Sequence, residues 1–326
     1  MQNKLLLIDT FYFMHRSFHA YPIDLQTKKG ERINIVFGLA QSLLDSISAL
    51  NPTHIACGWE SEEQPSFRKE LYPLYQANRI PGDIEEEKIF FGQFPRIIEL
   101  LEAFNIPRLV QEGFEGDDVL GTVASLASKE LPVVISTSDQ DLLQLINKNI
   151  NVYRPSRPPY ISSQLFDEKE FEKKYGFTPK QMIDYKSLRG DSSDNIPGVK
   201  GVGDKTAKKL IQEFQNLENI YKNLNKIESA SLREKLSSEK ENAFLSKQLA
   251  TIVTNIPMQF NLQSSEVHDF DINQVRALFD ELEFNSLQKK LDKLETIQKI
   301  KNNLVKKREQ VSKKTENNSE NQLQFF

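Results

Sequence analysis

The chain has 326 residues, and its 42 Lys and Arg against 46 Asp and Glu give a formal net charge of −4, which by itself argues against a nucleic-acid partner. This length suffices for two packed domains or one large domain, and 13 glycines with 14 prolines exclude a collagen-like or wholly disordered chain. Cys57 is the single cysteine, so an intramolecular disulfide is excluded; with no apolar run long enough for a signal or membrane segment, we expect a cytoplasmic protein.

Short apolar runs in the first half of the chain predict buried strands at residues 4–8, 53–59, 108–111 and 132–137. Amphipathic stretches between them predict helices, clearest at 34–50 and 92–104. Strands that alternate with helices indicate an α/β fold with a central, mainly parallel sheet flanked by helices on both faces. We expect this domain to span residues 1–160.

Helical signals dominate after residue 160. Thr178 and Pro179 predict the start of a helix over 180–188, a second helix begins at Asp204 or Lys205 and runs to Phe214, and further helices are expected at 232–252 and 271–299. An all-helical domain is therefore expected over 161–295. Residues 289–314 carry ten basic and three acidic side chains, and the polar residues after them predict a flexible basic tail over 296–326.

Acidic side chains follow each predicted strand. The carboxyl ends of parallel strands gather ligand groups at one edge of a sheet, so these side chains are expected to converge, joined by a pair three residues apart that shares one face if helical. The nine are Asp9, Glu60, Glu115, Asp117, Asp118, Asp139, Asp141, Asp191 and Asp194. Such a cluster needs cations, and oxygen-only donors suit two Mg²⁺ or Mn²⁺ ions. Any one of these acids reads equally well as a helix cap or a solvated loop residue, and only their repetition favours a metal site.

A glycine-rich turn stands directly before the helix expected at 204–214. Glycines let backbone N–H groups approach a phosphate, and the local charge of +3 gives a sequence-independent grip on DNA. The candidate DNA-binding residues are Gly198, Lys200, Gly201, Gly203, Lys205, Thr206, Lys208 and Lys209.

The run from Leu188 to Ala207 resembles the signature of the 5′-nuclease (flap endonuclease) family, which includes the N-terminal 5′→3′ exonuclease domain of bacterial DNA polymerase I. Shorter matches lie at 7–9, 67–73, 114–118, 136–145 and 278–284, so the resemblance covers residues 1 to about 293. No polymerase domain follows within this sequence, from which we expect a stand-alone nuclease.

The resemblance implies a PIN-like domain, a helical arch at about 75–105 and a C-terminal helix–hairpin–helix (H3TH) DNA-binding subdomain. It also implies a divalent-metal-dependent 5′→3′ exonuclease or flap endonuclease with a two-ion site on the nine acids and K⁺ at the hairpin. Its partners would be DNA with 5′ flaps, nicks or ends, including RNA–DNA hybrids, and its role would be removal of RNA primers or flaps in replication and repair. We expect a monomer associated with the nucleoid and not with membranes.

Departures from the family pattern keep a second function open. Glu60 stands in place of the usual Asp, Ser138 in place of Gly, and Gln76 in place of a Lys that supplies positive charge beside the scissile phosphate. We therefore expect slower cleavage, with Gln76, Arg79 and Lys69 as the catalytic residues around that phosphate. The alternative is a catalytically weakened protein that binds branched DNA or the clamp.

The C-terminal peptide resembles the bacterial sliding-clamp-binding type. Its candidate partner-binding residues are Gln322, Leu323, Phe325 and Phe326, at the end of an otherwise polar tail. The plain alternative is a frayed apolar terminus.

Overall fold

The structure is a computed structural model, and it describes residues 3–61, 64–78, 84–156, 162–266 and 270–296. Residues Met1–Phe270 form one compact unit and Asp271–Phe326 a second. None of the helices described is long and apolar enough to cross a membrane.

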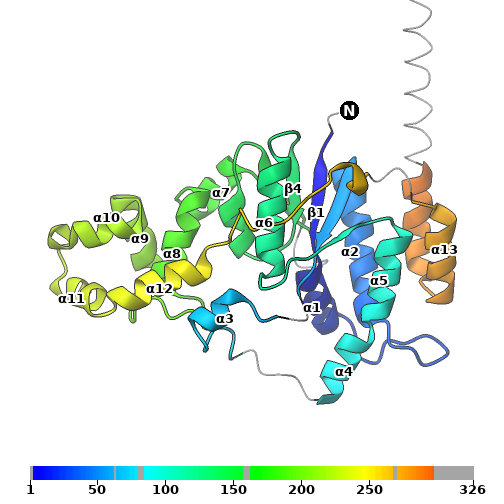
Figure 1. Cartoon of the computed structure of the whole chain (residues 1–326), viewed down its shortest axis with the longest axis horizontal. Coiled ribbons are helices and arrows are strands. Elements are labelled where there is room, and N and C mark those ends of the chain that lie inside the picture. The colour runs from blue at the N-terminus through cyan, green and yellow to red at the C-terminus, as the bar shows by residue number, and fades with distance from the viewer. Residues whose placement is uncertain (1–2, 62–63, 79–83, 157–161, 267–269, 297–326) are drawn as a thin grey trace, which may run out of the picture. The chain divides into compact units, whose positions relative to one another are not determined.

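A six-stranded sheet organises the first unit (Figure 1). Its strands are β1 (Leu5–Asp9), β2 (His54–Gly58), β3 (Arg108–Leu109), β4 (Val133–Ser136), β5 (Ile150–Arg154) and β6 (Gln164–Phe166). They lie in the order β3-β2-β1-β4-β5-β6, and all neighbours are parallel except β5 and β6. Leu5 on the central strand pairs with His54 on one side and Val133 on the other, so β1, β2 and β4 end at the same edge.

Helices follow the strands in the expected alternation. In the α/β part they are α1 (Thr10–Ala20), α2 (Asn34–Leu50), α3 (Phe67–Leu71), α4 (Ile84–Gly92), α5 (Phe94–Ala103), α6 (Gly116–Ala127) and α7 (Glu168–Tyr175). Successive strand residues face opposite sides of a sheet. Leu5 and Leu7 join the core formed with α6, and Leu6 and Ile8 on the other face are also buried. Both faces are therefore covered, which confirms the expected α/β fold.

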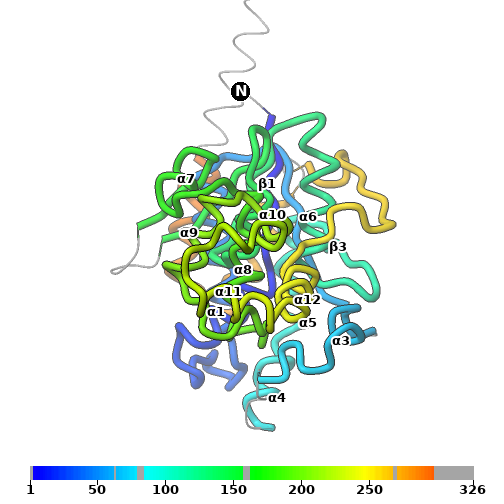
Figure 2. The backbone as a smooth tube through the Cα atoms, turned by 90° about the vertical axis from the view of Figure 1, so that its left-hand side faces the viewer, coloured from blue at the N-terminus to red at the C-terminus, as the bar shows by residue number. Residues whose placement is uncertain are grey.

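The helices after α7 pack beside the sheet. They are α8 (Met182–Arg189), α9 (Asp204–Phe214), α10 (Leu217–Lys222), α11 (Ala230–Ser238) and α12 (Lys240–Ala250). α8 packs against both α9 and α12, and Figure 2, turned toward these helices, shows them in front of β1. The predicted helix that starts at Asp204 or Lys205 and ends at Phe214 is confirmed, with its start at Asp204. The Thr178–Pro179 start is a short 3-10 turn, Pro179–Gln181, that leads into α8.

Two strands, β5 and β6, were not predicted from the sequence. β5 follows a turn and carries Asn151 within its apolar residues, and β6 is an edge strand of three residues paired antiparallel to β5. The expectation of an all-helical segment after residue 160 is wrong at β6, because a strand of this length shows no periodicity. In the segment expected to form the arch, α5 packs on α2 through its buried face, and residues 79–83 lie outside the described part.

The second unit is helical. α13 (Ile272–Glu281) and a helix at 285–296 pack through Phe279 and Phe284, and Arg276 pairs with Asp292 at 2.7 Å. The expected tail over 296–326 lies outside the described residues from 297 onward.

Candidate active site

Carboxylates gather at the edge of the sheet where β1, β2 and β4 end. A pocket of about 420 Å³ opens there, and seven of the nine predicted acids line it: Asp9, Glu60, Glu115, Asp117, Asp139, Asp141 and Asp194. For six of them this follows from the parallel register, because the chain segments that leave β1 to β4 turn over the same edge, whereas Asp194 comes from the turn after α8.

Asp9 is the last residue of β1 and the N-cap of α1. One of its carboxylate oxygens accepts a hydrogen bond from the Tyr12 N–H at 3.1 Å, and the other accepts one from the Thr137 hydroxyl at 2.6 Å. Thr137 also accepts the Asp139 N–H at 2.9 Å, and Asp139 accepts the Asp141 N–H at 2.8 Å. The turn after β4 thus places three acids in a chain of short contacts.

Burial and mutual repulsion raise the pKa values of carboxyl groups in this cluster. Burial, with the neighbouring Asp139 and Glu60, raises the pKa of Asp9 to about 7 against the hydrogen bonds that lower it. Burial, with Asp9 and Asp139 close by, also raises the pKa of Asp117 well above its ordinary value. Protons therefore bind Asp9 and Asp117 more tightly than they bind a solvated carboxylate, and a bound divalent cation would offset the repulsion between the neighbouring carboxylates.

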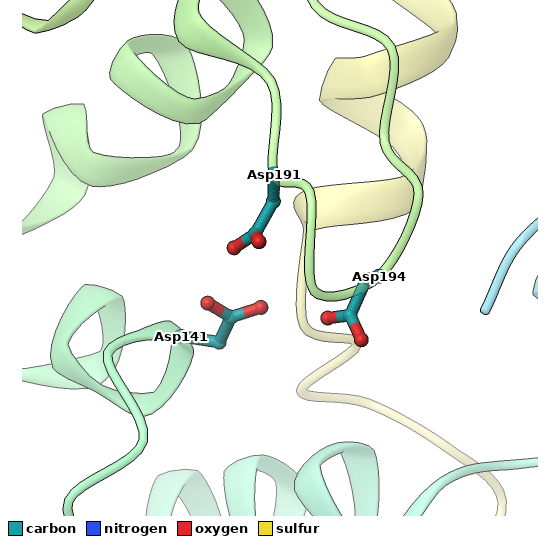
Figure 3. Close-up of side chains that lie close together, drawn as sticks. All are labelled: Asp141, Asp191 and Asp194. Atoms are coloured by element: carbon teal, nitrogen blue, oxygen red, sulfur yellow. The ribbon is translucent and has the colours of Figure 1, made fainter. Parts of the chain in front are cut away.

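A second group of acids forms around a tight turn. Asp141, Asp191 and Asp194 each offer an oxygen, and these oxygens lie within 4.8 Å of one another (Figure 3). Asp191 and Asp194 are in a turn closed by paired backbone hydrogen bonds between Asp191 and Ile196, and not on the helix face considered from their spacing. The turn brings both acids to Asp141.

Lys186 occupies the space between two of these acids. Its ammonium lies 2.7 Å from Asp191 and also contacts Asp141. Although burial opposes it, the Lys186 charge lowers the pKa of Asp191 to about 2. Lys186 is buried on α8, and sequence reasoning missed it because no local pattern links it to Asp141.

Asp118 does not join the pocket. Both of its oxygens accept hydrogen bonds from the Arg68 guanidinium, at 2.7 and 2.8 Å, and the side chain is fully buried. Arg68 also lies 3.5 Å from Glu115 and donates to the backbone carbonyls of Leu249 and Thr251. Asp118 thus holds Arg68 in place, and Arg68 lines the pocket as its one Arg or Lys in the part of the chain that the structure describes.

The predicted catalytic residues lie in three different situations. Lys69 is exposed on α3 and is absent from the pocket lining, whereas its neighbour Arg68 lines the pocket. Gln76 lines the pocket with φ = 56°, and its N–H donates to the Asp194 carbonyl at 2.9 Å. Arg79 lies outside the described residues. Arg68 had one signal in the sequence, its place inside the family-like run 67–73.

Tyr75 is a further residue of the site. It is buried, and its hydroxyl donates to Glu115 at 3.1 Å. Asn195 in the acidic turn donates to the Leu74 carbonyl at 2.6 Å, so the segment around Tyr75 and Gln76 is fastened to that turn.

The glycine-rich turn has the geometry expected of a backbone-exposing hairpin. Gly198 has φ = 63° and packs against Gly190, and Gly201 has φ = 82°. Gly203 caps α9, where the exposed Lys200, Lys205 and Lys209 and the partly buried Thr206 lie close by. Lys208 pairs with Asp204 at 3.0 Å. The clamp-binding candidates Gln322, Leu323, Phe325 and Phe326 lie outside the described residues.

Comparison with known proteins decides the family. The family described as 5′-3′ exonuclease, N-terminal resolvase-like domain matches residues 4–176, and the 5′-3′ exonuclease, C-terminal SAM fold matches residues 177–273. The chain belongs to the 5′-3′ exonuclease family. Together the two matches cover the sheet, the carboxylate pocket and the glycine-rich hairpin.

Relatives of this 5′-3′ exonuclease family member include DNA polymerase I of Caldicellulosiruptor bescii, 38% identical over 299 residues, and DNA polymerase I of Bacillus subtilis, 36% identical over 293 residues. The alignments take in 90% and 89% of this chain but only 34% and 32% of those proteins, so the chain spans about a third of their length.

Solved structures share the fold. The bacteriophage T5 5′-exonuclease with bound zinc has a TM-score of 0.65 at 19% identity, over 77% of this chain and 90% of that one. The T5 flap endonuclease in a complex with DNA and metal ions has a TM-score of 0.63 at 19% identity, over 90% of this chain and 99% of that one. These likenesses confirm a mainly parallel sheet joined to a helical C-terminal subdomain.

Proposed function

We propose that this chain is a structure-specific 5′ nuclease that hydrolyses DNA phosphodiesters by two-metal-ion catalysis. The observation that carries the proposal is the convergence of seven carboxylates in one pocket beside a glycine-rich hairpin. Family membership supports the reaction class, and the arrangement of acids supports its dependence on divalent metal ions.

The donor set fits Mg²⁺ or Mn²⁺. Every candidate ligand is a carboxylate oxygen, which is the donor that these hard cations prefer. The Glu115 Oε1 atom is buried and has no hydrogen-bond partner among the described residues, as expected of an atom that serves a cation. Asp9, Glu115, Asp117 and Asp139 would hold one ion, and Asp141, Asp191 and Asp194 the other.

When bound, such ions neutralise the scissile phosphate and lower the pKa of attacking water. The protein positions the groups around them. Thr137 orients Asp9, Tyr75 and Arg68 orient Glu115, and Asp139 fixes the start of the turn that carries Asp141. Gln76, held by its contact with the acidic turn, would donate an amide hydrogen bond to substrate where the family pattern has a charged Lys.

The hairpin and the following helix would hold the duplex. Backbone N–H groups around Gly201 and Gly203, together with the exposed lysines, favour phosphate contacts that carry no sequence information. Such contacts fit a nucleic-acid duplex, and on family membership we propose DNA with 5′ flaps, nicks or ends as substrate, including RNA–DNA hybrids. K⁺ at the hairpin stays a prediction.

We extend the proposal to removal of flaps or RNA primers during replication and repair, by a cytoplasmic monomer associated with the nucleoid. The C-terminal peptide would tether the nuclease to a sliding clamp. The second candidate is a weakened protein that binds branched DNA, and Gln76 favours it. The clustered acids argue against it, because the repulsion that raises the pKa values of Asp9 and Asp117 has an energetic cost unless cations offset it.

The test is a comparison of 5′-labelled flap, nicked and gapped duplexes with Mg²⁺, Mn²⁺ or chelator. We expect cleavage only with a metal ion, and products that carry 5′-phosphate and 3′-hydroxyl ends. Asp24→Asn, which removes an exposed acid outside the pocket, is the matched control for Asp139→Asn. Structure-selective binding with no cleavage under any metal ion would instead establish the binding-protein alternative.

A further inference from the structure

A second pocket adjoins the carboxylate pocket on the side of β5. It has a volume of about 170 Å³, several times the roughly 30 Å³ that one water molecule occupies in the liquid. Tyr12 and Asp139 line both pockets, so the two lie side by side. If one phosphate of a DNA strand lies at the carboxylates, a neighbouring phosphate of the same strand can reach the second pocket.

The topology explains why cations gather here. β4 and β5 are parallel, so the turn after β4 and Arg154 at the end of β5 leave the same edge of the sheet. Arg16 lies one helical turn after Tyr12 on α1, and Lys174 lies in the last turn of α7. Arg16, Arg154 and Lys174 all line the pocket, and among the described residues Asp139 is the one carboxylate that does so.

In the described part of the chain, hydrogen bonds and a contact with an aromatic ring, and not carboxylates, hold these three cations in place. Arg16 donates to the Ser156 carbonyl at 3.1 Å, and Arg154 donates to the Gln164 side chain at 2.7 Å. The Lys174 ammonium lies 4.9 Å from the centre of the Phe166 ring. Among the described residues, no carboxylate forms an ion pair with any of the three.

Two further observations indicate that the pocket suits an anion. The Arg154 Nε atom is buried, and no described residue accepts its hydrogen bond. Burial, together with the neighbouring Arg154, lowers the pKa of Lys174 from its ordinary value. An anion in the pocket would accept the free N–H and relieve the repulsion between the two cations.

We propose that this second pocket binds a phosphate group of the substrate strand while the carboxylate pocket holds the scissile phosphate. The inference rests on the proposed nuclease function for its substrate, but the pocket's affinity for phosphate stands without cleavage. The ligand is either the terminal 5′-phosphate monoester or a phosphodiester within the strand, since both present anionic non-bridging oxygens to guanidinium groups.

The first test needs no DNA. Inorganic phosphate is titrated against the metal-free full chain, and its effect on the unfolding temperature is compared among wild type, Arg154→Gln, Lys174→Gln and Lys173→Gln. Lys173 is the matched control, an exposed cation on the same helix that lies outside the pocket. We expect phosphate to stabilise wild type and Lys173→Gln more than the two pocket variants. Equal stabilisation of all four proteins would overturn the proposal.

The second test identifies the source of the phosphate. Binding of flap DNA is measured in Ca²⁺, and we expect Arg154→Gln and Lys174→Gln each to weaken it roughly tenfold and Lys173→Gln by less than twofold. If the loss vanishes with a 5′-hydroxyl substrate, the ligand is the terminal monoester. If it persists there and vanishes with an internal methylphosphonate, the ligand is a phosphodiester. Losses no larger than that of Lys173→Gln would refute the pocket even if wild type cleaves DNA normally.

Discussion

Asp9 shows how one residue serves both the fold and the site. Its carboxylate caps α1 and accepts from Thr137, and the same burial that makes these bonds strong raises its pKa to about 7. The sequence located Asp9 because it directly follows a strand. It marked Arg68 only as part of the family-like run 67–73. It could not show that Arg68 pairs with Asp118, 50 residues away, or that this pairing withdraws Asp118 from the pocket.

The raised pKa of Asp9 predicts a specific dependence of stability on pH. The folded-state pKa lies above the unfolded value of 3.8, so the folded protein binds the proton more tightly and loses stability as the pH rises through about 7. In chelator, we expect the free energy of unfolding to fall by about 2 kcal/mol between pH 5.5 and 8 from this residue alone. Denaturant titrations should show a shallower decline for Asp9→Asn, whereas an unchanged or rising profile would contradict the assignment.

Gln76 gives a prediction on catalysis. Replacing it by Lys adds positive charge at the pocket, and we expect the single-turnover cleavage rate to rise roughly threefold to tenfold, equivalent to about 0.7–1.4 kcal/mol in the barrier. Gln274→Lys adds the same charge at an exposed position on α13 and should leave the rate unchanged. A rate for Gln76→Lys at or below that of wild type would show that the Gln76 amide does not limit the cleavage rate.

At the scale of elements, long periodic segments were predictable and short ones were not. α2 was predicted to the residue, and α9 to within one residue at its start, because each has an apolar face over three or more turns. β6 has three residues, and the acidic turn at Asp191 depends on a backbone pairing that leaves no periodic trace. The convergence of the acids followed from strand ends, whereas their separation into two groups required the structure.

The glycine-rich hairpin carries the element-scale prediction. Gly198 has φ = 63°, and a Cβ there would lie 2.3 Å from the Gly190 nitrogen, so Gly198→Ala should destabilise the protein by more than about 1 kcal/mol and weaken DNA binding. Gly203 has φ = −96° and open space around its Cα, so Gly203→Ala is the matched control and should fold normally. Equal thermal unfolding midpoints for the two variants would contradict this account of the hairpin.

At the scale of the whole molecule, the net charge of −4 conceals opposed parts. An acidic pocket at the sheet edge, three cations in the adjoining pocket and a basic hairpin lie within the first unit, and basic residues dominate 289–314. The sum argues against nucleic acid, whereas the placement of the charges supports it. Composition alone could not show this, because it discards position.

The C-terminal peptide is tested on the whole chain. Deleting residues 322–326 should abolish binding to a bacterial sliding clamp and leave cleavage of naked flap DNA intact, because the deletion lies far along the sequence from the carboxylate pocket. Replacing Phe325 and Phe326 by Ala should have the same effect. Surface-immobilised clamp provides the measurement, and undiminished affinity of the shortened chain would refute the tether.

The central claim is that the clustered carboxylates hold the metal ions that cleave a 5′ flap. The most direct measurement is the single-turnover rate on a 5′-flap duplex as a function of Mg²⁺ concentration, for wild type and Asp139→Asn, with DNA binding of both measured in Ca²⁺. We predict a rate that rises with Mg²⁺ to a plateau in wild type and falls by at least about 100-fold in Asp139→Asn, while both proteins bind the flap. Equal rates for the two proteins, or wild-type cleavage that persists in chelator, would contradict the account.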